Sequence, residues 1–233
     1  MKSHARPVAR AFKAEPPGSS RRIFIVEDHP VFREGLVQII AGEKDLMVCG
    51  EAGEADHARQ AIARLKPDLV LVDITLPGKS GLELIKELRS RDSKIRILVV
   101  SMHDEALYAD RVLRAGGDGY IMKQEDPDEI VHAMRDVLAG HIYVSEEVLA
   151  RATKASQAGV AKPEARALDV LTDEELNILE LLGRGKNNDD IARQLHLEVR
   201  KVIARCLQMR RKLRLKSNNA LVRHAAFWVE EGV

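Results

Sequence analysis

Five polar side chains of this sequence follow short apolar runs. They are Glu27 and Asp28 after the run at 23–26, Asp73 after 69–72, Ser101 at the end of 95–100, and Lys123 after 119–122. Neighbouring carboxylates repel one another unless a cation joins them, and hard oxygen ligands of this kind suit Mg²⁺. Asp73 can then act as a nucleophile that accepts a phosphoryl group. Mg²⁺ and Lys123 would neutralise charge on the transferred oxygens, and Ser101 would donate a hydrogen bond to one of them.

Each of these residues also has an ordinary structural explanation. Taken singly, Asp28 reads as a turn or helix cap, Ser101 as a strand-end cap, and Lys123 as a solvated surface lysine. Glu27 can pair with a basic neighbour, and Tyr120 can simply pack in the core. Their joint placement after successive apolar runs is what favours a shared site.

The elements that would position this site are five short strands, each followed by a helix. The predicted strands are Ile23–Val26, Met47–Glu51, Leu69–Val72, Ile95–Val100 and Gly119–Met122. The segments between them carry apolar residues at helical spacing, and the last helix begins near Pro127. Continuous apolar strands that alternate with helices predict a doubly wound α/β fold with a parallel sheet covered on both faces. Ligands bind such sheets at the carboxyl ends of the strands, so the polar residues are expected to converge there.

The C-terminal part of the chain lacks strand signals and is predicted to be all-α. Thr172 and Glu175 form a capping box for a first helix that ends at Gly183 and Gly185. A second helix from about 188 to 195 is separated by a tight break at 196–197 from a third, basic helix at about 198–212. Residues 217–219 cap a fourth helix that ends near Val229. Two helices joined by a short break form a helix-turn-helix pattern.

Charge divides the chain in the same way as the secondary-structure signals. Residues 23–145 hold 15 Lys/Arg and 22 Asp/Glu, a net charge of −7, whereas residues 184–223 hold 12 Lys/Arg and 3 acids, a net charge of +9. This asymmetry predicts two domains with different partners, the basic one facing a polyanion. Residues 1–20 are predicted to be a disordered basic tail, and residues 146–170 to be a linker.

Two cysteines far apart in the sequence argue against a disulfide framework and favour a reducing compartment. The apolar runs are too short to span a bilayer, and residues 1–22 carry no apolar stretch of signal-peptide length. The expected location is therefore the cytoplasm, with no membrane partner.

Residues 21–145 resemble a response-regulator receiver domain, which has a flavodoxin-like fold. The matching residues are Glu27-Asp28-His29-Pro30, Asp73 within the segment 72–81, Ser101, Tyr120 and Lys123. Residues 171–233 resemble the LuxR-type helix-turn-helix output domain of the NarL/FixJ subfamily. That match rests on Leu171-Thr172, Glu175, Leu179, Gly185, Asn188, Ile191-Ala192, Leu195, Val202, Lys212-Leu213, Leu215 and Leu221-Val222.

The resemblance implies a phosphorylation-dependent transcriptional regulator rather than an enzyme. A histidine kinase would phosphorylate Asp73, with Mg²⁺ held by Glu27, Asp28, Asp73 and the backbone carbonyl of Thr75. Ser101 and Tyr120 would form the switch pair: Ser101 bonds the phosphoryl group and Tyr120 turns inward. The expected consequence is homodimerisation, or release of the output domain to bind double-stranded DNA.

The expected DNA contacts are Arg200, Lys201 and Arg205 on the basic helix, with Lys186 and Asn188 near the preceding helix. Three positions depart from the family pattern. Ile203 replaces the usual Lys, Arg205 the usual His, and Glu198 a common Ser or Thr cap. The target sequence therefore stays open, and Ile203 is expected either to contact a thymine methyl group or to join a protein interface.

Two other functions fit parts of the sequence. A signalling adaptor would use the basic helical domain to bind a protein or RNA instead of specific DNA. A Mg²⁺-dependent phosphohydrolase would use the same acidic sheet edge, but such enzymes usually carry a second Asp two residues after the nucleophile, where this chain has Thr75.

Overall fold

The structure, a computed structural model, describes residues 20–91, 94–146, 148–150 and 170–231. The chain divides into two compact units, with the division between Ala152 and Thr153. Most of the predicted tail at 1–20 and of the predicted linker at 146–170 lies outside the described residues. The domain boundaries proposed from the sequence therefore stay predictions.

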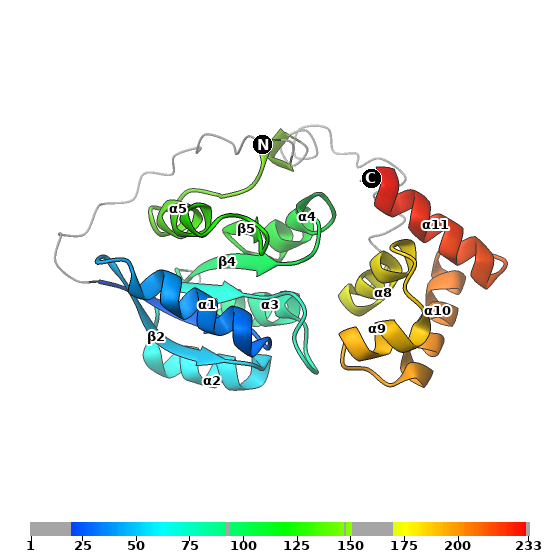
Figure 1. The fold of residues 1–233 in the computed structure, drawn as a ribbon, viewed down its shortest axis with the longest axis horizontal. Coiled ribbons are helices and arrows are strands. Elements are labelled where there is room, and N and C mark those ends of the chain that lie inside the picture. Colours follow the sequence, from blue (N-terminus) through cyan, green and yellow to red (C-terminus); the bar gives the residue numbers. More distant parts are fainter. Residues whose placement is uncertain (1–19, 92–93, 147, 151–169, 232–233) are drawn as a thin grey trace. The chain divides into compact units, whose positions relative to one another are not determined.

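The first unit is a five-stranded parallel sheet with helices on both faces (Figure 1). The strands, in chain order, are β1 (Arg21–Val26), β2 (Leu46–Ala52), β3 (Leu69–Val72), β4 (Arg96–Ser101) and β5 (Gly119–Met122). The helices are α1 (Pro30–Ala41), α2 (Ala55–Leu65), α3 (Gly81–Arg91), α4 (Glu105–Ala115) and α5 (Pro127–Leu138). Helices α1 and α5 contact each other on one face of the sheet, and α2, α3 and α4 pack in sequence on the other. The predicted doubly wound α/β fold is confirmed.

The central strands β3 and β4 form where the sequence is almost continuously aliphatic. All four residues of β3 are at most 1% exposed, as are Ile97, Leu98, Val99 and Val100 in β4. Strands buried on both faces are expected when helices cover a parallel sheet on both sides. The bounds of β3 and β5 agree with the predicted ranges, whereas β4 begins and ends one residue later, so that Ser101 is its last residue.

The strand order, β2-β1-β3-β4-β5, places β1 between β2 and β3. The chain thus leaves β1 toward one edge of the sheet and later returns to build toward the other edge. In doubly wound sheets this reversal of direction opens a crevice at the carboxyl ends of the two central strands. Here those strands are β1, which leads into Glu27 and Asp28, and β3, which leads into Asp73.

The second unit contains helices joined by short loops and, within residues 170–231, no strand. It consists of α8 (Asp173–Gly183), α9 (Asn188–Gln194), α10 (Val199–Lys212) and α11 (Asn218–Glu231). The capping box predicted at Thr172 and Glu175 is present, with both reciprocal hydrogen bonds formed. His196 adopts a left-handed conformation, with φ of 51°, and this provides the tight break between α9 and α10. The predicted all-α helix-turn-helix fold is confirmed.

Aliphatic side chains and one tryptophan fill the core of the second unit. Val202, Cys206 and Met209 face inward from α10, and Leu221, Ala225 and Trp228 face inward from α11. Glu198 occupies the N-cap position of α10 and forms no capping hydrogen bond, as expected for a residue in place of a Ser or Thr cap. Among the described residues, no helix is both long and apolar enough to cross a membrane.

Candidate functional site

A buried lysine joins two carboxylates at the carboxyl edge of the first unit's sheet. The Lys123 ammonium lies 2.5 Å from Glu27 Oε2 and donates a hydrogen bond of 2.7 Å to Asp73 Oδ2. The side chains of all three residues are at most 4% exposed. The backbone N–H of Lys123 also donates to the carbonyl of Ser101, at 2.8 Å, so the ends of β4 and β5 are joined beside the carboxylates. The structure thus brings together four of the five polar residues that the sequence places at strand ends.

Burial and nearby charges have opposite effects on the pKa values of Asp73 and Lys123. Burial raises the pKa of Asp73 to about 6, because loss of solvent outweighs the attraction of Lys123, and the Glu27 carboxylate adds repulsion. Burial opposes the positive charge of Lys123, but the Asp73 and Glu27 carboxylates outweigh it and raise the pKa of the ammonium group. The pocket therefore favours extra positive charge beside Asp73.

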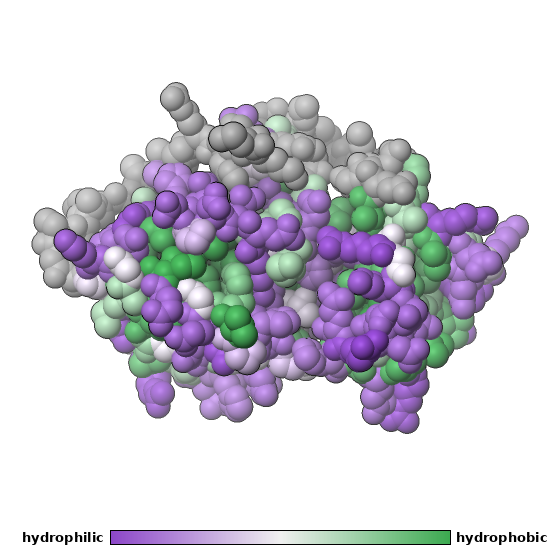
Figure 2. Space-filling view, viewed as in Figure 1, coloured by the Kyte–Doolittle hydropathy of each residue, from purple (hydrophilic) through white to green (hydrophobic). Residues whose placement is uncertain are grey.

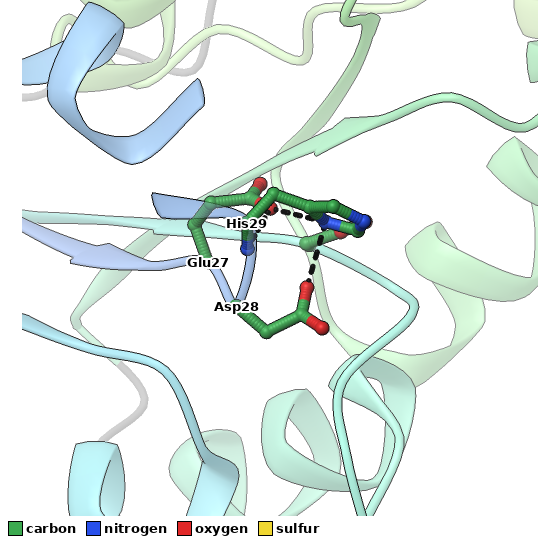
Figure 3. A group of neighbouring side chains, drawn as sticks. Glu27, Asp28 and His29 are labelled. Carbon is green, nitrogen blue, oxygen red and sulfur yellow. Dashed lines mark hydrogen bonds and ion pairs between the residues drawn. The ribbon is translucent and has the colours of Figure 1, made fainter. Parts of the chain in front are cut away.

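Asp28 and His29 complete an acidic cluster with Glu27 and Asp73. One potential ligand atom from each of the four residues lies within 4.8 Å of the others. His29 Nδ1 lies 3.0 Å from Glu27 Oε1 and 2.9 Å from Asp28 Oδ1, and Figure 3 shows the imidazole held between the two carboxylates. Three carboxylates and the single ammonium of Lys123 leave a formal charge of −2. A divalent cation with a preference for oxygen matches both that charge and these donors. The sequence reasoning did not include His29 in this cluster.

The loop after β3 packs tightly against Asp73. The Thr75 N–H donates to Asp73 Oδ1 at 3.3 Å, which fixes the orientation of the carboxylate. A Cβ atom at Gly81 would lie 2.0 Å from the carbonyl oxygen of Asp73, so only glycine fits where α3 begins. The backbone N–H of Thr75 therefore lies beside Asp73, and coordination of a metal by the Thr75 carbonyl stays a prediction.

A second network links the end of β4 to β5 through His103. The His103 N–H donates to Ser101 Oγ at 3.3 Å, and Tyr120 donates its hydroxyl proton to the His103 carbonyl at 2.9 Å. The His103 ring lies 2.8 Å from Thr75 Oγ1, in the loop that holds Asp73. Ser101 and Tyr120 are fully buried, so Tyr120 already has the inward orientation that the family resemblance assigns to the switched form. Sequence reasoning missed His103, although its place two residues after Ser101 puts it at this strand end.

The chain that leaves α5 returns to Tyr120. Tyr143 forms a parallel bridge with Gly119, and its carbonyl accepts a hydrogen bond of 2.7 Å from the Tyr120 N–H. Two residues later, the Ser145 N–H donates to Glu105 in the first turn of α4, at 2.7 Å. A displacement of α4 or β5 would therefore reach the segment that leads into residues 146–170.

In the second unit, a glutamate on α8 holds two of the basic residues expected to bind DNA. Glu174 accepts a hydrogen bond of 2.7 Å from Lys201 and another from Arg205. Burial of Glu174 opposes its ionisation, but these hydrogen bonds outweigh it and lower the pKa of the carboxyl group. Lys201 and Arg205 thus lie on the side of α10 that faces the start of α8, a pairing that the sequence reasoning missed.

The other expected DNA contacts are more exposed. The side chain of Arg200 is 85% exposed and pairs with Glu198, the acidic residue that stands at the N-cap of α10. Lys186 is exposed in the turn before α9. Asn188, at the start of α9, is partly buried and lines a cavity of about 270 Å³ bordered by α8, α9, α10 and α11. On α10, the Arg200 side chain therefore points into solvent, whereas Lys201 and Arg205 lie along the flank of the helix.

Comparisons with known proteins match both units. A family described as "Response regulator receiver domain" matches residues 23–135, and one described as "Bacterial regulatory proteins, luxR family" matches residues 169–225. The chain is 34% identical over 214 residues to the nitrate/nitrite response regulator protein NarL of Escherichia coli, and the match covers 90% of this chain and 94% of that protein. It is 31% identical to the oxygen regulatory protein NreC of Staphylococcus epidermidis, over 88% of this chain and 96% of that one.

A solved structure supports the same family assignment as the sequence matches. A two-component response regulator of the LuxR family from an Aurantimonas species shares 34% identity with this chain and has a TM-score of 0.55. That similarity covers 60% of this chain and 99% of the Aurantimonas chain.

Proposed function

The chain belongs to the NarL/FixJ subfamily of two-component response regulators, and we propose that Asp73 is the residue whose phosphorylation controls it. It is a DNA-binding transcriptional regulator with a receiver domain and a LuxR-type output domain. The observation that carries the proposal for Asp73 is its position: a carboxylate 3% exposed, in hydrogen bond with Lys123, within the acidic cluster at the switch point of the sheet. This membership favours a DNA-binding output over the adaptor alternative.

Mg²⁺ would be held by Glu27, Asp28, Asp73 and the backbone carbonyl of Thr75. The fit rests on the donors, which supply hard oxygen atoms and a formal charge of −2 at one point. When bound, the ion would neutralise the negative charge that gathers between Asp73 and an incoming phosphoryl group. The imidazole of His29 would have to leave the two carboxylate oxygens it now approaches.

The proposed reaction is phosphoryl transfer from a histidine kinase. An oxygen of Asp73 attacks phosphorus of the kinase's phosphohistidine, an O–P bond forms, and the P–N bond breaks. The departing imidazole keeps the bonding electron pair and takes a proton from solvent. Lys123, already beside Asp73 Oδ2, would stabilise the transferred oxygens, and the Ser101 hydroxyl would bond one of them in place of its contact with the His103 N–H.

The proposed switch is movement of Ser101 with Tyr120 held inward. Phosphorylation adds about −1.5 to −2 charge units at Asp73. Ser101 is tied through His103 to the hydroxyl of Tyr120, so its movement would reshape α4 and β5. A bistable element of this kind couples a local charge to a distant output. We expect the outcome to be homodimerisation that brings two output domains to DNA in the cytoplasm.

The proposed DNA contacts combine bases and phosphates. Arg200, exposed near the start of α10, is placed to reach base edges in the major groove. Lys201 and Arg205 would contact phosphates from the flank of the helix, and Lys186 and Asn188 would add contacts near the start of α9.

A magnesium titration tests the proposed metal site. Because an ion that binds only the folded state stabilises it, Mg²⁺ at 100 times its dissociation constant is expected to add about 2.7 kcal/mol to the free energy of unfolding of the receiver unit. Thermal melting at increasing Mg²⁺ concentration measures this. Asp28→Asn is expected to remove most of the gain, whereas Asp126→Asn, at an exposed helix N-cap, is expected to keep it. An equal gain in Asp28→Asn and wild type would exclude this ligand set.

A further inference from the structure

The exposed surface of α10 is not the uniformly basic face that its sequence indicates. Val202, Cys206 and Met209 form its buried face. On one flank, Lys201 and Arg205 are engaged by Glu174, and Lys212 donates to Glu175 at 2.6 Å. Three of the helix's cations therefore point toward α8, which leaves other residues to face outward.

Two large apolar residues stand exposed on the opposite flank. Ile203 is 53% exposed and Leu207 is 43% exposed, and they lie one helical turn apart. Arg200 precedes Ile203 by three residues, so the three side chains form a continuous stripe along the helix. We call Arg200, Ile203 and Leu207 the α10 stripe. Ile203 and Leu207 also line the cavity beside α11, and Figure 2 shows hydrophobic surface beside hydrophilic residues over α10 and α11.

We propose that the α10 stripe reads thymines: Ile203 and Leu207 pack against thymine C5-methyl groups in the major groove while Arg200 contacts a neighbouring base or phosphate. The inference rests on the proposed function, because it names the DNA that the output domain selects. The thymine methyl group is the apolar feature that base edges present in the major groove, and aliphatic side chains recognise it. The second helix of a helix-turn-helix lies in that groove and contacts base edges with its N-terminal residues.

Charge argues for DNA rather than a second copy of this chain as the occupant of the stripe. Residues 200–216 contain eight basic residues and no acid: Arg200, Lys201, Arg205, Arg210, Arg211, Lys212, Arg214 and Lys216. Glu174, Glu175 and Glu198 pair with four of these cations, and a symmetric contact through the α10 stripe would still bring the other four against their own copies, where like charges repel. A DNA groove instead supplies phosphates on both sides of an apolar floor of thymine methyl groups.

The test replaces thymine with uracil, which lacks only the C5-methyl group. A duplex recovered from a random library with the phosphorylated full-length chain is resynthesised with deoxyuridine in place of deoxythymidine, and both dissociation constants are measured. Burial of one methyl group is worth about a fourfold change in affinity, so two contacts predict roughly a fifteenfold weaker complex with the uracil duplex. The double variant Ile203→Ala with Leu207→Ala is expected to bind both duplexes equally.

Matched variants distinguish thymine recognition by the α10 stripe from general DNA affinity and from a protein interface. Phe227→Ala removes an apolar side chain on α11 that is 56% exposed, and it is expected to keep the wild-type discrimination between the two duplexes. Lys201→Gln is expected to weaken both complexes by the same factor.

Equal binding of the two duplexes by the wild-type protein, or unchanged discrimination in the double alanine variant, would overturn the inference and leave the proposed function standing. Loss of self-association in that variant without any change in discrimination would identify a protein interface and would also overturn it. Failure to recover any duplex would overturn the proposed function itself.

Discussion

Asp73→Asn is expected to abolish phosphorylation of this protein. The carboxylate supplies the attacking oxygen, and an amide of nearly the same shape has no comparable nucleophile. Incubation with acetyl phosphate and Mg²⁺, followed by intact-mass spectrometry, should show one added phosphoryl group on the wild-type chain and none on the variant. Asp56→Asn, at an exposed position in α2, should be labelled like the wild type. Labelling of Asp73→Asn at the wild-type rate would move the acceptor to another residue.

The same variant should be more stable than the wild type when Mg²⁺ is absent. Burial raises the pKa of Asp73 to about 6, above the value of 3.8 for an unperturbed aspartate, so the folded state favours the protonated acid. Stability from that preference is complete below about pH 4 and is lost as pH rises through about 6. At pH 7.5 the neutral amide is therefore expected to raise the free energy of unfolding. This gain would show that lost labelling does not come from misfolding.

Lys123→Met should produce the largest loss of stability among single substitutions in the pocket. The ammonium lies between Glu27 and Asp73, and without it two buried carboxylates face each other with no counter-charge. Removing one partner of a buried ion pair costs about 3–5 kcal/mol. Urea denaturation in the absence of divalent ions measures the loss, and added Mg²⁺ should recover part of it because the cation replaces the missing charge.

Lys79 provides a matched control for that substitution. Its ammonium also joins two carboxylates, Asp56 at 3.2 Å and Glu87 at 2.8 Å, but at the surface of the protein. Solvent-exposed ion pairs contribute little to stability because water screens them, so Lys79→Met should lower stability far less than Lys123→Met. Equal effects at Lys79 and Lys123 would mean that burial does not govern the energetics of the acidic pocket.

Local sequence signals predicted the elements of this fold because each signal acts within a few residues. The bounds of β3 and β5 follow from short apolar runs, and the start of α8 follows from the reciprocal hydrogen bonds of Thr172 and Glu175. The acidic site was predicted for a related reason. Parallel strands end at one edge of the sheet, so Glu27 and Asp73 had to meet once the strands were placed.

Contacts between distant side chains were not predictable in the same way. Glu174 and Lys201 lie 27 residues apart, and nothing in the spacing of either shows that α8 and α10 bring them together. His103 links Thr75 to Ser101 and Tyr120 only because the β3 loop and the end of β4 are neighbours in the sheet. The sequence therefore predicted where the basic residues of α10 are, but not which of them are held by carboxylates.

The contacts of α10 show what the residues that depart from the family pattern do in this structure. Glu198 does not cap α10 but pairs with Arg200. Position 203, where the family pattern has a lysine, carries an isoleucine that is exposed beside Leu207. Together with the pairing of Glu174, these substitutions reduce the number of unpaired cations that the helix presents outward. We expect the output domain to depend on apolar contacts with DNA more than its net charge indicates.

The central claim is that a phosphoryl group on Asp73 controls the binding of DNA, and one measurement tests it directly. Fluorescence anisotropy would follow a labelled duplex, obtained by in vitro selection, as the full-length protein is added at constant Mg²⁺ with and without acetyl phosphate. We predict that the phosphodonor tightens binding at least tenfold for the wild type and has no effect on Asp73→Asn. Superimposable wild-type curves with and without the donor, from protein shown by mass to be phosphorylated, would contradict the account.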